Sequence, residues 1–122
     1  MRLLVCGTRI SNPDKLKSYE VVVKDILLSY ASAVDNLEIV EGCCLNSADQ
    51  FAELFALEHD LKVHHFPSHA GNYLQRNIEM VELADEVLAF FDSYSYGTAH
   101  TIATAVRLKK PVKVIDIGRG RL

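Results

Sequence analysis

Residues 90–105, FFDSYSYGTAHTIATA, begin with the end of a buried strand and finish in a helix. An apolar run closes at Phe91, and helical spacing of apolar residues begins at Thr98. The connector SYSYG at 93–97 is rich in hydroxyl groups and ends in a glycine. Two interpretations stay open: a site for a phosphate-sized anion, or a serine cap followed by a plain glycine turn.

The same alternation of strand and helix continues along the whole chain. Five apolar runs predict strands. They lie at residues 2–6, 37–41, 62–66, 86–91 and 112–117. Four stretches with helical periodicity separate them, beginning near residues 13, 48, 73 and 98. Asn12-Pro13 is a helix-start signal, and Ser47 with Gln50 fits a capping box.

Strands separated by single helices predict a parallel sheet with right-handed crossovers and helices on both faces. The expected fold class is α/β: a Rossmann-like three-layer sandwich with a five-stranded parallel sheet in the order 3-2-1-4-5. One domain would span residues 1–122. In this order the winding reverses between strands 1 and 4, and ligands bind beyond the carboxyl ends of the strands at that point.

Composition limits the classes of function. The chain has 122 residues, 49% hydrophobic and 24% charged, as a globular domain does. Its net charge of −3 makes a nucleic acid an unlikely partner, because nucleic-acid-binding domains are usually basic. No long apolar run predicts a membrane span, and the start MRLLVCG is too short for a signal peptide. Three cysteines without zinc spacing indicate a reducing, cytoplasmic location.

The carboxyl ends of strands 1 and 4 supply the candidate ligand-binding residues. They are Gly7, Thr8 and Arg9 after strand 1, and Ser95, Gly97, Thr98 and Thr101 after strand 4. An arginine forks onto a phosphate, and the backbone N–H groups at a helix start attract the same anion.

The third helix adds Arg76 and Asn77. Asn77 falls inside the apolar arc of that helix, and a buried amide needs a specific partner. The partner is either a ligand or the 92–97 connector, and Arg76 has the alternative of pairing with Glu79 or Asp85.

Carboxylates lie at and near the predicted ligand cleft. Glu41 and Asp92, at the carboxyl ends of strands, are the candidate catalytic groups. The alternative for Asp92, as for Asp49, is a helix-entry acid near a positive helix end. His64 and His65 are consecutive on a strand and point to opposite faces, so no metal site is expected. The chain has no P-loop, GxGxxG or GxSxG motif, and no cofactor is expected.

Four short motifs resemble the SLOG superfamily, and in particular its small stand-alone YspA-like members. They are VCGTR, ADQFA, RNIEM and SYGTAHTI, in that order. The resemblance implies a Rossmann-like nucleotide-binding domain, with Gly42 added to the binding residues already given. SYSYGTAHT keeps a Gly-Thr pair but lacks the glutamate of the PGGxGTxxE motif in the related Lonely Guy phosphoribohydrolases.

The main expectation is therefore binding of a nucleotide or nucleotide-derived small molecule, as a sensor, carrier or sequestering module. The first alternative is an enzyme acting on N-glycosidic bonds, a phosphoribohydrolase or deoxyribosyltransferase. The second is single-stranded DNA binding, by resemblance to DNA-processing protein A. A homodimer or higher homo-oligomer is expected, since exposed tyrosines such as Tyr94 and Tyr96 suit a subunit contact.

Overall fold

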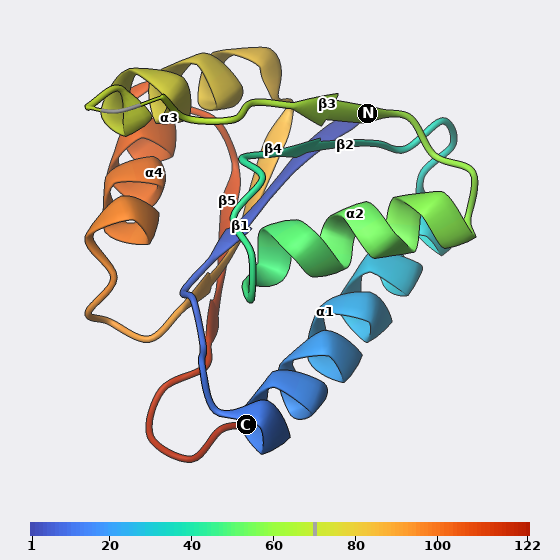
Figure 1. Ribbon diagram of the computed structural model, residues 1–122. Coiled ribbons are helices and arrows are strands. Elements are labelled where there is room, and N and C mark those ends of the chain that lie inside the picture. The colour runs from blue at the N-terminus through green and yellow to red at the C-terminus, as the bar shows by residue number, and fades with distance from the viewer. Residues whose placement is uncertain (70) are drawn as a thin grey trace.

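The computed structural model describes residues 1–69 and 71–122, in which strands and helices alternate (Figure 1). The elements are β1 Arg2–Gly7, α1 Pro13–Ala33, β2 Glu38–Glu41, α2 Ala48–Glu58, β3 Val63–His65, α3 Tyr73–Leu83, β4 Glu86–Phe91, α4 Tyr96–Arg107 and β5 Val112–Asp116. The predicted strand limits differ from these by at most one residue.

All neighbouring strands of the five-stranded sheet are parallel, and their order is β3-β2-β1-β4-β5. The predicted fold class and strand order are confirmed. Gly7 pairs in register with Phe90, so β1 and β4 end side by side. Because the chain winds outward in opposite directions from these two strands, their carboxyl ends leave a crevice between the connections.

Helices cover both faces of the sheet, α1 and α2 on one and α3 and α4 on the other (Figure 1). Alternate residues of β1 enter the two resulting cores, Leu3 on the α1–α2 side and Leu4 on the α3–α4 side. Tyr19 of α1 is fully buried and meets Phe51 and Phe90 edge-to-face. Burial on both faces explains why the strands are continuous apolar runs.

The helix starts follow their capping residues. Asn12 accepts hydrogen bonds from the N–H groups of Asp14 and Lys15, as the Asn-Pro signal predicts. Ser47 caps α2, but the side chain of Gln50 accepts from the N–H of Asn46, so the predicted capping box is not reciprocal.

Helix α4 begins at Tyr96, two residues before the predicted start. Its N-cap is Ser95, whose hydroxyl accepts from the N–H of Thr98. The early cap places Gly97 inside the first helical turn instead of in a turn before it.

The longest helix, α1, has 21 residues and carries charged side chains such as Asp14, Lys15 and Lys17. Among the residues that the structure describes, no helix combines the length and the apolarity that crossing a membrane requires.

Candidate functional site

A cavity of about 360 Å³ opens at the carboxyl ends of β1 and β4, where the winding of the sheet reverses. Pockets of roughly 300–1,000 Å³ suit small-molecule ligands. The structure brings eight of the sequence-predicted site residues together in its wall. They are Gly7, Arg9, Arg76, Asn77, Ser95, Gly97, Thr98 and Thr101.

The first turn of α4 forms one wall of this cavity. Asp92 accepts hydrogen bonds from the N–H groups of Tyr94 and Ser95, at 2.8 and 2.9 Å, and so fixes the loop that leads into the helix. Partial burial opposes ionisation, but these N–H donors and the hydroxyl of Thr8 together lower the pKa of Asp92. The first backbone N–H groups of a helix lack helical partners and carry its positive dipole end, so this wall favours an anion.

Three glycines lie at or near the cavity, and they differ in how much space a side chain would have at each position. A Cβ at Gly7 would clash with the hydroxyl of Tyr19, and a Cβ at Gly42 would lie 2.5 Å from Nη1 of Arg76. A Cβ at Gly97 would meet no heavy atom within 4 Å. Packing among the described residues therefore explains Gly7 and Gly42, but it does not require a glycine at 97.

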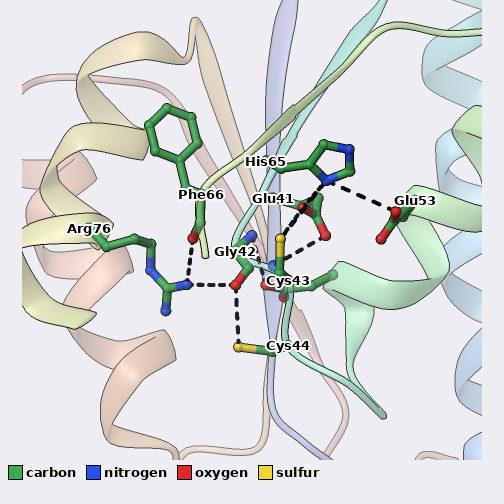
Figure 2. Close-up of polar contacts among 9 residues, drawn as sticks. Glu41, Gly42, Cys43, Cys44, Glu53, His65, Phe66 and Arg76 are labelled. Carbon is green, nitrogen blue, oxygen red and sulfur yellow. Dashed lines mark hydrogen bonds and ion pairs between the residues drawn. The ribbon is translucent and has the colours of Figure 1, made fainter. Parts of the chain in front are cut away.

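Arg76 of α3 lines the cavity and points toward the loop after β2 (Figure 2). Its Nη1 donates to the carbonyl oxygens of Gly42, at 2.6 Å, and Phe66, at 3.0 Å. It pairs with neither Glu79 nor Asp85, the sequence-based alternative. Main-chain carbonyls of two loops and the side-chain oxygen of Asn77 thus hold the guanidinium in place, and its charge acts on the carboxyl group of Asp49 in the same cavity wall.

Asn77 is the buried amide that the helical pattern singled out, and it is 3% exposed. Its Nδ2 lies 3.4 Å from the carbonyl oxygen of Gly97 and 3.3 Å from Nδ1 of His100, and its Oδ1 accepts from Nε of Arg76. Asn77 therefore ties α3 to the start of α4 and orients Arg76, which fits the alternative in which it holds the connector.

The carboxylates are arranged differently from the sequence-based expectation. Neither Glu41 nor Asp92 lines the cavity. Glu41 is fully buried on the other side of the loop, beside His65 and Cys43, and Asp92 caps the loop before α4. Asp49, expected only as a helix-entry acid, is the carboxylate in the cavity wall.

Asp49 is 4% exposed and accepts hydrogen bonds from the N–H of Gly42 and the hydroxyl of Ser47. Burial, followed by the charge of Glu41, raises the pKa of Asp49 to about 6, although Arg76 and the Gly42 N–H act in the opposite direction. Asp49 is thus the carboxyl group whose protonation would change the charge of the cavity wall.

Two predicted residues, Thr8 and Gly42, lie outside the lining. Thr8 accepts a hydrogen bond from the N–H of Asp92 and so links the ends of β1 and β4. Gly42 supplies the carbonyl that holds Arg76. Six lining residues were not in the predicted set: Cys6, Cys44, Asp49, Ser68, Tyr73 and Met80. They lie in β1, in the loops after β2 and β3, at the start of α2, and in α3, and the order of the strands was the available signal for them.

A neighbouring pocket of about 350 Å³ shares Arg9 with the first. Its lining includes the basic residues Lys15 and Arg119, together with Asp92 and Tyr94. Tyr94 is 82% exposed there, and Tyr96, at the start of α4, is 66% exposed. This second pocket therefore presents both positive charge and the exposed aromatic ring of Tyr94.

No protein-family model matches the chain, and no curated protein matches it either. Among solved structures it is similar to DNA processing protein A from Helicobacter pylori, a structure described for its single-stranded DNA binding mode. The TM-score is 0.64 at 18% sequence identity, and the match covers 93% of this chain and 64% of that protein. The chain thus spans less than two thirds of that structure, and the likeness shows a shared fold.

This comparison corrects one expectation. The sequence made a nucleic acid an unlikely partner because the net charge is −3. That exclusion is contradicted, since the protein that shares the fold binds single-stranded DNA. The physical reason is that net charge is a sum over the whole chain, whereas binding depends on the charge of one surface.

Proposed function

We propose that this chain is a SLOG-type domain of the YspA-like kind that binds a nucleotide or nucleotide-derived small molecule in the cavity between β1 and β4. The observation that carries the proposal is Gly97. It lines the cavity, lies in the first turn of α4, and has open space where its Cβ would be. A phosphate that packs against the backbone of this turn would use that space.

The charges of the cavity support an anionic ligand. Among the described residues, those that line it include two arginines, Arg9 and Arg76, and one carboxylate, Asp49. Ser95, Thr98 and Thr101 add hydroxyl groups on the same side. A guanidinium and several neutral donors around one point suit a phosphate group.

The test is a calorimetric titration of the full chain with nucleoside mono- and diphosphates. Arg9 is exposed and makes no ion pair with the described residues, so Arg9→Ala removes charge without disturbing the fold. We expect Arg9→Ala to weaken binding roughly 10-fold or more, as loss of a charged hydrogen bond does. Arg107→Ala, at the far end of α4, is the matched control and should bind as the parent does. Equal affinities for all three proteins, or no binding at all, would overturn the proposal.

Single-stranded DNA is the second candidate, and two observations favour it. The solved structure that shares the fold is of a protein that binds single-stranded DNA. In addition, the exposed ring of Tyr94 lines a pocket together with Arg9 and Arg119, and Tyr96, two residues further on, is also exposed. Proteins bind single strands with stacked aromatic rings and basic grooves.

The two candidates differ in their response to salt. Fluorescence anisotropy with a labelled oligothymidine, at near-physiological and lower salt, measures the DNA candidate directly. Affinity for a strand should fall steeply as salt rises, because each phosphate contact releases counterions. A mononucleotide at one site should show a much shallower dependence. If the oligonucleotide binds and mononucleotides fail to compete, the DNA candidate replaces the first.

A further inference from the structure

A second cluster of reactive side chains lies on the opposite side of the 42–44 loop from Arg76, which lines the cavity (Figure 2). Glu41 and His65 are register partners at the carboxyl ends of β2 and β3, so their side chains stand side by side on one face of the sheet. Cys43 follows β2 and turns back toward both of them, whereas Cys44 lines the cavity.

The three side chains converge on a small volume. Nδ1 of His65 lies 3.0 Å from Oε2 of Glu41, Sγ of Cys43 lies 3.2 Å from the same oxygen, and Sγ and Nδ1 are 3.9 Å apart. Tetrahedral zinc, with bonds of about 2.3 Å to sulfur and about 2.0–2.1 Å to nitrogen or oxygen, separates its ligand atoms by about 3.3–3.6 Å. The observed separations lie on both sides of these values, so small rotations of the side chains would admit the ion.

A positive charge close to Glu41 would stabilise its buried carboxylate. Its carboxylate is fully buried, and its partners are the N–H of Cys43, a weakly donating thiol and the ring of His65. A buried carboxylate with so few strong donors is costly. Glu53 of α2 adds a second carboxylate, 4.0 Å from Nδ1 of His65.

The backbone of the loop holds the thiol in this position. Cys43 has φ of 63°, in the left-handed region that residues other than glycine rarely adopt. Such a conformation costs free energy and persists where the surroundings or a function maintain it. In Cys43 it directs Sγ over the carboxylate of Glu41.

We propose that Glu41, Cys43 and His65 bind a zinc ion, with the fourth position beside Glu53 open to water. Thiolate, imidazole and carboxylate are the donors that zinc prefers, whereas magnesium and calcium select oxygen ligands alone. The sequence predicted no metal site because His64 and His65 point to opposite faces of their strand and the chain shows no zinc-ligand spacing. The register of β2 against β3 is what brings Glu41, Cys43 and His65 together.

Cobalt(II) is the probe, since it replaces zinc and gives an intense thiolate-to-metal absorption band when a cysteine coordinates it. The full chain, reduced and freed of metal by chelation, is titrated with Co²⁺ and then with Zn²⁺ or Mg²⁺. We expect one Co²⁺ per chain with a thiolate band, which Zn²⁺ displaces and Mg²⁺ does not.

Single substitutions identify which side chains coordinate the metal ion. Cys43→Ser should abolish the band and weaken Zn²⁺ binding about 100-fold or more, since loss of an outer partner alone costs about 10–100-fold. Cys44→Ser, one residue away but facing the cavity, is the matched control and should keep the band. His65→Asn, at a half-exposed side chain, should weaken binding similarly and covers the case in which Cys43→Ser does not fold.

Two results would overturn the proposal. One is the absence of a thiolate band in the parent protein. The other is a band that survives Cys43→Ser or His65→Asn, or that Cys44→Ser removes equally, because the thiol or the imidazole would then belong to a different site.

Discussion

Nη1 of Arg76 donates to the carbonyl oxygen of Gly42 at 2.6 Å, and this bond joins α3 to the loop after β2. The contact depends on the absence of a side chain at residue 42, where a Cβ would lie 2.5 Å from Nη1 and 2.9 Å from Cζ of Arg76. One cavity wall is therefore set by a glycine that does not itself line the cavity.

Gly42→Ala should lower the free energy of unfolding by about 1–3 kcal/mol, the usual cost of forcing atoms into a packed site. It should also weaken nucleotide binding, because Arg76 must move. Urea denaturation measures the first effect and calorimetry the second. Unchanged stability and affinity would mean that the position of Arg76 does not depend on this contact.

Asp49 predicts a pH dependence of stability. Burial and the charge of Glu41 raise its pKa to about 6, above an unfolded value of about 4. The native state then holds this proton to a higher pH than the unfolded chain does. The free energy of unfolding should therefore fall as the pH rises from about 4 to about 6, by at most roughly 3 kcal/mol.

Asp49→Asn removes this contribution. Relative to the parent, the variant should gain stability as the pH rises from about 4 to about 6 and should keep that gain at higher pH, as measured by urea denaturation at each pH. Equal pH profiles for the two proteins would show that Asp49 ionises as it does in water. Arg76 and the Gly42 N–H, which oppose the raised pKa, are unchanged in the variant.

The third prediction concerns catalysis. Glu41 and Asp92 lie outside the cavity, and Asp49 is engaged by Gly42 and Ser47, so we expect nucleoside monophosphates to survive prolonged incubation intact. Chromatography for the free base checks this. Released base would contradict it, and comparing Asp49→Asn with Glu41→Gln and Asp92→Asn would then identify the responsible carboxylate.

The sequence predicted the path of the chain well and the partners of its side chains poorly. Apolar runs and helical spacing predict the order of strands and helices along the chain. The right-handed β-α-β crossover then predicts the order of strands in the sheet, in which β1 and β4 are neighbours and Gly7 pairs with Phe90. Asn77 stood out because an amide in an apolar arc needs a partner.

The functional distinctions within the site depended on three-dimensional detail. Whether Glu41 or Asp49 faces the cavity depends on which way the 42–44 loop turns, and the positive φ of Cys43 is not visible in its residue type. Arg76 has carboxylates nearby in sequence, yet it binds carbonyls from two distant loops. Cross-strand register likewise decided that His65 meets Glu41.

The exposed tyrosines separate the two candidate ligands. If the chain binds single-stranded DNA, Tyr94→Ala and Tyr96→Ala should each weaken oligothymidine binding about 5- to 100-fold, because stacking contributes about 1–3 kcal/mol per base. Mononucleotide affinity should not change, since neither ring lines the cavity. Val106→Ala, an exposed apolar position at the other end of α4, is the control in the anisotropy assay. DNA binding that all three variants retain would exclude stacking on these tyrosines.

Gly97→Ala tests the central claim most directly, because it adds one methyl group where the described protein atoms leave space. The folded chain should tolerate it, and α4 should gain about 0.5–1 kcal/mol from the better helix former. If a nucleotide phosphate packs against this turn, calorimetry should show its binding weakened about 10-fold or more in Gly97→Ala, with stability unchanged or higher. Nucleotide affinity equal to that of the parent protein would show that no ligand approaches Gly97, and would contradict the account.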